Sequence, residues 1–342
     1  MDASSARLNF SFKPYRRPFR VPVRTSRGVW DTREGILIRV ADDEGSVGFG
    51  EIAPIHWFRT ETFVGALTWC ESLGPVVARE QLAQPGRGLP CCAAAASAAL
   101  DNMVPVDDAD SGAASHARRL PVAALLPAGW SALDALERAV ELGFTVFKLK
   151  IGVGDAQGEQ TLIDRLVGRM PDGAKLRLDA NGGLDARAAA RWLAIAEDWP
   201  VEFVEQPLPF DARDDLLRLA ADHAVPVALD ESILTADDIK RWRDRGWPGV
   251  FVVKPALAGR SDELVQELNA DPAPFVFSSA LETDVGLAAG AGLALRHGIR
   301  RALGYGTGAF FHDDRLGGSI STPWFGPIEW AELDLAALWK RL

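Results

Sequence analysis

The sequence predicts an α/β protein in which a (β/α)8-type barrel carries an α+β capping domain, formed by the N-terminal segment and the C-terminal tail. Two observations predict this fold class. Short apolar runs alternate with helical stretches from residue 122 to about residue 304, which is the pattern of repeated strand–helix units. Ahead of them, residues 6–103 contain first a β-rich and then a helical pattern, as expected of a separate α+β unit.

The N-terminal unit is predicted to begin with an antiparallel meander over residues 6–53. Leu8, Phe10 and Phe12 alternate with polar residues, and two more strands flank the turn at residues 42–45. The polar segment Arg24–Trp30 is either a plain hairpin connection or a mobile loop that covers a ligand. Residues 60–103 are predicted to be helical, and Pro105–His116 is predicted to be a linker.

Eight apolar runs of the second unit are predicted to be barrel strands: Val122–Leu126, Thr145–Lys150, Leu176–Asp179, Phe203–Glu205, Val227–Asp230, Val250–Lys254, Phe275–Phe277 and Arg301–Leu303. Helices are expected between them, for example Ser131–Gly143 and Asp185–Glu197. An open doubly wound sheet would alternate in the same way, but no Gly-rich phosphate loop follows the first run.

The last segment is rich in Trp, Pro and Gly and is predicted to return onto the capping domain, ending in a helix over Glu329–Leu342. The expected domain limits are therefore residues 1–112 for the cap, 113–309 for the barrel and 310–342 for the return.

Composition limits the partners of this chain. Its 342 residues are 48% apolar and 25% charged, and the net charge of -10 argues against nucleic acid. No run is long enough to span a membrane. Cys70, Cys91 and Cys92 form no disulfide framework, and Met1–Phe10 lacks the apolar run of a signal peptide, so a cytoplasmic location is expected. The oligomeric state is left open.

Polar residues follow the predicted strands at the point where each strand ends. They are Lys148, Lys150, Asp179, Glu205, Asp230, Lys254, Ser278 and Ser279. The C-terminal ends of barrel strands converge on one mouth, so these side chains should face one another. The segment Gly304–Gly308 closes the last strand, as either a turn or a close approach of the backbone to a ligand.

Asp179, Glu205 and Asp230 place three carboxylates on three consecutive strands. Crowded carboxylates repel one another, and a divalent cation removes that conflict. Oxygen ligands favour Mg²⁺, with Mn²⁺ as an alternative ion. Each acid alone would more often cap the following helix, but three in step between two lysines favour a metal site.

The lysines predict acid–base chemistry. Lys148 and Lys150 share one face of a strand, and Lys254 would lie on the other side of a substrate held by the metal. An amine near a metal can serve as a general base, here for proton abstraction next to a carboxylate. The expected partner is therefore a small-molecule carboxylate.

Taken together, these motifs resemble the muconate-lactonizing subgroup of the enolase superfamily. The resemblance is carried by Lys148-Leu149-Lys150, Asp179-Ala180-Asn181, Glu205-Gln206-Pro207, Asp230-Glu231-Ser232, Lys254-Pro255 and, in the cap, residues 49–54. Within the subgroup, Arg177 and the segments 253–259 and 277–282 are most similar to the o-succinylbenzoate synthase family. That resemblance implies a Mg²⁺-dependent hydro-lyase, which removes water from 2-succinyl-6-hydroxy-2,4-cyclohexadiene-1-carboxylate through an enediolate in menaquinone or phylloquinone synthesis.

The resemblance also implies a role for each matched residue. Lys150 would take the ring proton, Lys254 would hold the opposite face as a cation, and Lys148 would favour the neutral form of the base. The metal ligands would be Asp179, Glu205 and Asp230, supported by Asn181 and Glu231. Ser278 and Ser279 would bind the succinyl carboxylate. Arg177 would either bind a carboxylate in the barrel or form a structural salt bridge.

Other functions of the same residues stay open. An N-succinylamino acid racemase or a dipeptide epimerase would use the same lysines and ion, although residues 304–306 offer no acidic pair for a dipeptide amine. A barrel that only binds a metal or a carboxylate belongs to another class, and it would not need two flanking amines.

Overall fold

The computed structural model describes residues 7–25, 28–105, 118–326, 329–330 and 332–342. Except for Pro105, the predicted linker Pro105–His116 lies outside these residues. Two sheets organise the chain, a five-stranded sheet in the N-terminal part and a parallel sheet after it. We refer to residues 7–105 as the cap.

The cap sheet has the strand order β4-β1-β2-β3-β5, with strands β1 Arg7–Thr25, β2 Gly28–Ala41, β3 Ser46–Ile52, β4 Val76–Ala78 and β5 Val104–Pro105. Leu8 and Phe10 are buried, whereas Arg7 and Asn9 are exposed, as the alternation predicts. The Asp42 carboxylate accepts hydrogen bonds from the amides of Glu44 and Ser46, which fixes the predicted turn.

The predicted loop Arg24–Trp30 is strand wherever the structure describes it. Arg24 pairs with Val29, and Thr25 pairs with Gly28, so β1 and β2 continue almost to the tip of a hairpin. Of the two alternatives, the hairpin connection agrees with this pairing. The register shifts between Pro18 and Val23, because prolines cannot donate to the ladder.

Three helices pack on the cap sheet: α1 Phe63–Leu73, α2 Arg79–Ala83 and α3 Pro90–Asp101. The Glu61 carboxylate accepts hydrogen bonds from the amides of Cys91 and Cys92 at the N-terminus of α3. A side chain at Gly50 would collide with the backbone of α3, since an added Cβ would lie 2.1 Å from the carbonyl oxygen of Ala95. This glycine therefore lets α3 lie against β3.

The second sheet contains eight parallel strands in the order β12-β11-β10-β9-β8-β7-β6-β13. They are β6 Leu120–Leu126, β7 Val146–Lys150, β8 Lys175–Asp179, β9 Val201–Glu205, β10 Val227–Leu229, β11 Val250–Val253, β12 Phe275–Phe277 and β13 Leu303–Gly306. A parallel bridge between Ser278 and Gly304 joins the two ends of the sheet. The predicted barrel is thus confirmed.

The prediction for the last strand was wrong by several residues. We expected a strand at Arg301–Leu303 and a turn or ligand contact at Gly304–Gly308, but Gly304 and Gly306 belong to β13. An added Cβ at Gly304 would lie 2.7 Å from the Ser278 hydroxyl, and one at Gly306 would lie 2.7 Å from the carbonyl oxygen of Ala123. These glycines therefore let the neighbouring strands approach and close the barrel.

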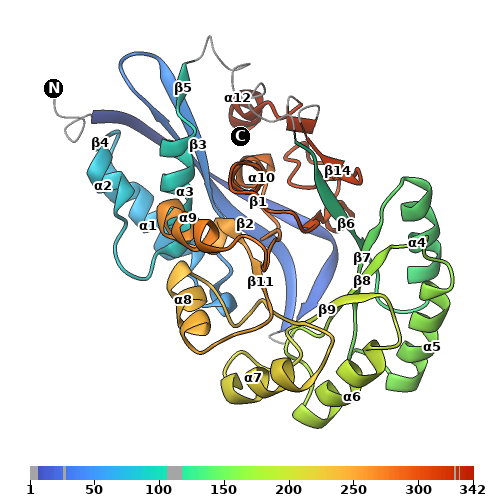
Figure 1. The fold of residues 1–342 in the computed structure, drawn as a ribbon. Coiled ribbons are helices and arrows are strands. Elements are labelled where there is room, and N and C mark those ends of the chain that lie inside the picture. Colours follow the sequence, from blue (N-terminus) through green and yellow to red (C-terminus); the bar gives the residue numbers. More distant parts are fainter. Residues whose placement is uncertain (1–6, 26–27, 106–117, 327–328, 331) are drawn as a thin grey trace.

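Helices run around the outside of this sheet (Figure 1). They are α4 Ala132–Glu141, α5 Ala156–Val167, α6 Ala186–Ala196, α7 Arg213–Asp222, α8 Ala236–Asp244, α9 Ser261–Ala270 and α10 Asp284–Arg296. Their apolar faces and the outward side chains of the strands form one large core, which includes Phe147, Leu176 and Trp192. No helix within the described ranges has the length and apolar character that crossing a bilayer requires.

The C-terminal segment contacts both parts of the molecule. Strand β14 (Trp324–Phe325) pairs antiparallel with β6 of the barrel. Helix α12 (Leu335–Arg341), which is shorter than the predicted Glu329–Leu342, packs Leu338 on a cluster with Tyr15 and Leu37 of the cap. The domain limits at 112 and 309 remain a prediction.

The cap and the barrel share a core. Ala256 and Leu257, just after β11, and Ala280, just after β12, belong to the apolar cluster of the cap. In addition, the Glu51 carboxylate from β3 accepts hydrogen bonds from the amides of Thr283 and Gly286, at the start of α10. The cap is therefore packed against the C-terminal ends of the barrel strands, where the predicted site lies.

Candidate active site

Strand β7 carries the two lysines on one face. Phe147 and Leu149 are buried against the outer core, whereas Val146, Lys148 and Lys150 are partly buried on the opposite face. This is the period-two pattern of a barrel strand, with helices outside and a polar interior. The prediction that Lys148 and Lys150 project side by side is confirmed by this alternation.

Lys148 lies between two of the predicted metal ligands. Its ammonium nitrogen is 2.8 Å from Asp179 Oδ2 and 2.7 Å from Glu205 Oε1. Asp179 and Glu205 are paired across neighbouring strands, which explains how one amine reaches both. Burial alone would lower the pKa of Lys148, but Asp179, Glu205 and Asp230 outweigh it and raise that pKa above its ordinary value. Lys148 is therefore held as a cation.

The other two lysines differ in their partners. Lys254 forms an ion pair with Asp230, and its ammonium lies 4.6 Å from the centre of the Phe58 ring. Lys150 has neither a hydrogen bond nor an ion pair to any described residue, although its side chain is only partly exposed. It pairs in register with Asp179, so it is beside the carboxylates and free to act on a substrate.

The carboxylates are crowded enough to disturb one another. Burial and the charge of Asp179 raise the pKa of Glu205 to about 7. Burial and Asp230 raise the pKa of Glu231 to about 8. The second carboxylate oxygen of Glu231 is buried without a hydrogen-bond partner among the described residues. A bound cation would relieve the repulsion among these acids, so the carboxylate donor set fits a hard divalent ion.

The geometry of a closed metal site is not formed, however. In the part of the chain that the structure describes, no three His, Cys, Asp or Glu side chains are spaced as metal ligands. The ammonium groups of Lys148 and Lys254 lie among the carboxylates instead. The ligand set Asp179, Glu205 and Asp230 thus remains a prediction.

Asn181 contacts one of these acids and Glu231, while the supporting role expected of both residues remains a prediction. The Asn181 amide donates to Asp179 Oδ1, and its side chain donates to Glu231 Oε1 at 3.3 Å. Asn181 has a φ of 44°, a left-handed conformation that asparagine tolerates better than most residues.

Gln206 belongs to a motif that carries the resemblance, but no role was assigned to it from the sequence. Its side chain is fully buried and donates to the Leu208 carbonyl and the Ser232 hydroxyl, each at 2.8 Å. Its side-chain oxygen accepts from the amides of Asp230 and Ser232. Gln206 therefore fixes the turn that carries Asp230. A polar residue directly after a buried strand was the available signal.

The two serines after β12 have different surroundings. The Ser279 hydroxyl is buried, donates to Glu282 Oε2 and accepts from the Leu281 amide. It is committed to the turn, which argues against the predicted contact with substrate. The Ser278 hydroxyl is partly exposed and has one long hydrogen bond, 3.4 Å, to the Gly304 carbonyl. Ser278 remains the candidate for substrate binding.

The Arg177 side chain points away from the predicted site. Its guanidinium donates to Glu202 Oε2 at 2.7 Å and to the Ala302 carbonyl at 2.8 Å. These partners lie near the N-terminal starts of β9 and β13, at the end of the barrel opposite Asp179. The Phe203 ring stacks beside the same guanidinium. This geometry favours the structural salt bridge over a contact with substrate.

The cap contributes residues that were not predicted from the sequence. Phe58, in a short turn over His56–Phe58, covers the ammonium of Lys254. The next residue, Arg59, donates to the Glu231 carbonyl and lies over the Phe210 ring. An aromatic-rich turn after the Phe49–Pro54 motif was the only signal in the sequence.

A closed parallel barrel with lysines and carboxylates at the C-terminal ends of its strands is the architecture of a (β/α)8 enzyme. The particular family follows from comparison with known proteins. Residues 131–315 match the family described as enolase C-terminal domain-like. The chain belongs to the enolase superfamily.

Relatives within the superfamily agree with this assignment. The o-succinylbenzoate synthase of Thermosynechococcus vestitus is 38% identical over 280 residues, which cover 80% of this chain and 85% of the relative. The crystal structure of o-succinylbenzoate synthase from Thermosynechococcus elongatus BP-1, complexed with Mg in the active site, superposes with a TM-score of 0.84 at 34% identity, covering 98% of this chain and 100% of that one.

The fold is also shared with an epimerase. A substrate-liganded complex of the L-Ala-D/L-Glu epimerase from Bacillus subtilis superposes with a TM-score of 0.75 at 20% identity, covering 89% of this chain and 91% of that one. At this identity the similarity extends to the fold alone.

Proposed function

We propose that this protein is a Mg²⁺-dependent o-succinylbenzoate synthase, a carbon–oxygen lyase. The observation that carries the proposal is the mouth of the barrel. There an unpaired lysine, Lys150, lies beside buried acids, and the second lysine, Lys254, comes from a strand further round the barrel. The substrate would be 2-succinyl-6-hydroxy-2,4-cyclohexadiene-1-carboxylate. The 38% identical relative supports the choice of substrate.

The proposed reaction needs one base. The neutral Lys150 amine takes the proton from ring carbon 1, and the electron pair of that C–H bond forms the new ring double bond. The C–O bond at carbon 6 breaks, and the hydroxide leaves with the proton from the Lys150 ammonium as water. The products are 2-succinylbenzoate and water, and Lys150 is again neutral.

The surrounding residues prepare the substrate for that step. Asp179, Glu205 and Asp230 would hold Mg²⁺, which, when bound, supplies positive charge next to the substrate carboxylate as the ring proton leaves. Lys254, kept at the opposite side by Asp230 and the Phe58 ring, contributes a second positive charge. Ser278 is the proposed donor to the succinyl carboxylate.

The runner-up is racemisation of an N-succinylamino acid. One observation supports racemisation: Lys150 and Lys254 come from two different strands, and two such lysines suit proton exchange on both faces of a carbon atom. Dehydration by one base does not require the second lysine to exchange protons. The epimerase similarity is at the level of the fold and does not raise this alternative further.

The test is turnover with both substrates. Purified protein with Mg²⁺ should remove the absorbance of the cyclohexadiene acid and give 2-succinylbenzoate, and EDTA should abolish the reaction. Racemisation of an N-succinylamino acid without dehydration would establish the runner-up instead. Activity in neither assay would leave a barrel that only binds its ligands.

The proposal extends to where the enzyme acts. Cys70, Cys91 and Cys92 are all buried as free thiols, which suits the reducing cytoplasm. The partner is the small-molecule carboxylate itself, and the negative charge of the chain disfavours nucleic acid.

A further inference from the structure

The turn after β12 contains a leucine in the left-handed conformation. Leu281 has a φ of 62°, which is uncommon for any residue other than glycine. Such a conformation persists only where the surroundings hold it, and it is concentrated at functional sites. Leu281 lies three residues after Ser278, the serine proposed to bind substrate, so the contacts that hold this turn bear on the substrate site.

Two hydrogen bonds within the turn involve the Ser279 hydroxyl. The Leu281 amide donates to the Ser279 hydroxyl at 2.8 Å, and that hydroxyl donates to Glu282 Oε2 at 2.8 Å. The Ser278 amide donates to the Val253 carbonyl of β11. The start of the turn is therefore tied to the barrel, and the N–H side of Leu281 is held from within.

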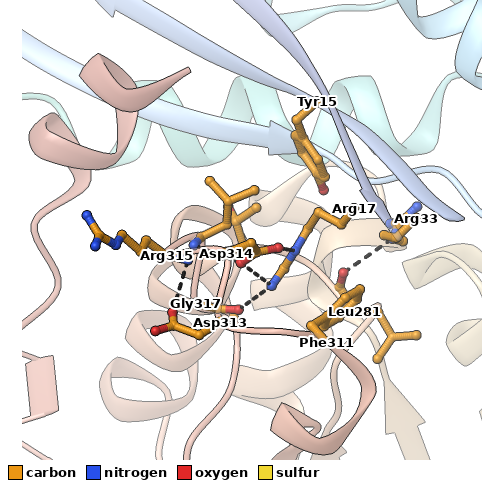
Figure 2. A network of polar contacts seen from close by, with 12 residues as sticks. Tyr15, Arg17, Arg33, Leu281, Phe311, Asp313, Asp314, Arg315 and Gly317 are labelled. Carbon is orange, nitrogen blue, oxygen red and sulfur yellow. Dashed lines mark hydrogen bonds and ion pairs between the residues drawn. The ribbon is translucent and has the colours of Figure 1, made fainter. Parts of the chain in front are cut away.

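The cap holds the carbonyl side of Leu281. Arg33 Nε donates to the Leu281 carbonyl at 3.3 Å (Figure 2). Arg17 Nη1 donates to the Glu282 carbonyl at 3.1 Å. Arg33 is itself fixed by the carbonyls of Glu34 and Pro54. It is 1% exposed, and a buried guanidinium requires such partners.

Four consecutive residues of the barrel turn thus depend on the cap. Ala280 packs into the cap core, Arg33 holds the Leu281 carbonyl, Arg17 holds the Glu282 carbonyl, and Glu51 accepts from the Thr283 amide. Of these contacts, the one from Arg33 acts on the strained residue itself.

We propose that Arg33 is a positioning residue: its hydrogen bond to the Leu281 carbonyl holds Leu281 in the left-handed conformation and thereby presents Ser278 to the succinyl end of the substrate. This inference rests on the proposed function. Both peptide planes that flank Leu281 are held, one by Ser279 and the other by Arg33. Without Arg33, the turn relaxes toward conformations that leucine prefers, and the change reaches Ser278 through its neighbour Ser279, whose hydroxyl accepts from the Leu281 amide.

The test asks whether glycine at position 281 compensates for the loss of Arg33. Arg33→Met should raise KM for the cyclohexadiene acid about tenfold, the factor that corresponds to about 1.4 kcal/mol of strain, with a smaller change in kcat. Adding Leu281→Gly should restore KM to within about threefold of the wild type, because glycine adopts a positive φ without strain. Adding Leu281→Ala removes the same side chain but keeps the strain, and should restore nothing.

The controls separate positioning from general destabilisation. Arg39→Met removes a partly exposed arginine from the same strand and should leave KM unchanged. If Arg33→Met also leaves KM unchanged, or if alanine restores KM as well as glycine does, the proposal is wrong. It is equally wrong if Arg33→Met abolishes Mg²⁺ binding, because the effect would then not be confined to the turn.

A readout without substrate keeps this inference distinct from the proposed function. Amide hydrogen exchange of residues 280–283 should be faster in Arg33→Met and slow again in Arg33→Met/Leu281→Gly, whatever reaction the enzyme catalyses. If wild-type protein does not turn over the cyclohexadiene acid, the proposed function fails, while the exchange experiment still tests the contact. Unchanged exchange in Arg33→Met would refute the positioning role directly.

Discussion

Replacing Gln206 by leucine tests whether one buried amide holds the turn that carries Asp230. The substitution keeps a side chain of similar size at a position that is fully buried, but it removes four hydrogen bonds. Each intramolecular hydrogen bond contributes about 1 kcal/mol net, so the loss of all four should destabilise the fold by roughly 4 kcal/mol. The amides of Asp230 and Ser232 would be left buried without an acceptor.

Two measurements follow from this geometry. The midpoint of urea unfolding should fall by the equivalent of about 3–4 kcal/mol with little change in slope. Mg²⁺ affinity should weaken about 10- to 100-fold, because residues that orient metal ligands have effects of that size. Gln157→Leu, on the exposed side of α5, is the matched control and should change stability by less than about 0.5 kcal/mol. A loss below about 1 kcal/mol in Gln206→Leu with unchanged Mg²⁺ binding would refute the reasoning.

Three further predictions concern the acids and the base. Lys150→Ala should abolish turnover but leave a Mg²⁺ titration unchanged; a near-native rate would show that another group is the base. Asp230→Asn should weaken Mg²⁺ binding measured by calorimetry, and an unaltered titration would remove it from the ligand set. Burial raises the pKa of Glu282 from 4.5 to about 7, so the folded state binds more protons than the unfolded state between these values, and stability should fall as pH rises from about 4.5 to 7. Glu282→Gln should remove that part of the decline, by up to about 3 kcal/mol, and curves that stay parallel across this range would contradict the shift.

The barrel and its polar mouth could be predicted because strand ends are local features with a global consequence. Lys150, Asp179, Glu205 and Lys254 each follow an apolar run, and a closed parallel barrel places all such positions at one rim. Alternation also predicted the shared face of Lys148 and Lys150. These inferences need only the period of a strand and the direction of the sheet.

Other features depend on the direction of a long side chain or on contacts between residues far apart in the sequence. Alternation gave the face of Arg177 but not the direction of its long side chain, which reaches Glu202 at the far end of the barrel. Glycine-rich residues 304–308 suggested a turn, because the need for small residues where strands close a barrel is visible only after the neighbours are known. Arg33 and Leu281 are 248 positions apart, and no local pattern connects them.

The shared core of cap and barrel makes the selectivity of this enzyme sensitive to changes far from its ligand. Ala256 and Ala280 each lie within two residues of a group proposed to meet the substrate, yet their side chains pack among cap residues. A substitution that enlarges or shortens a side chain on the inner side of the cap sheet would shift those turns before it unfolded the protein. Variants with altered preference among succinylated acids should therefore arise at apolar cap positions that never touch the substrate.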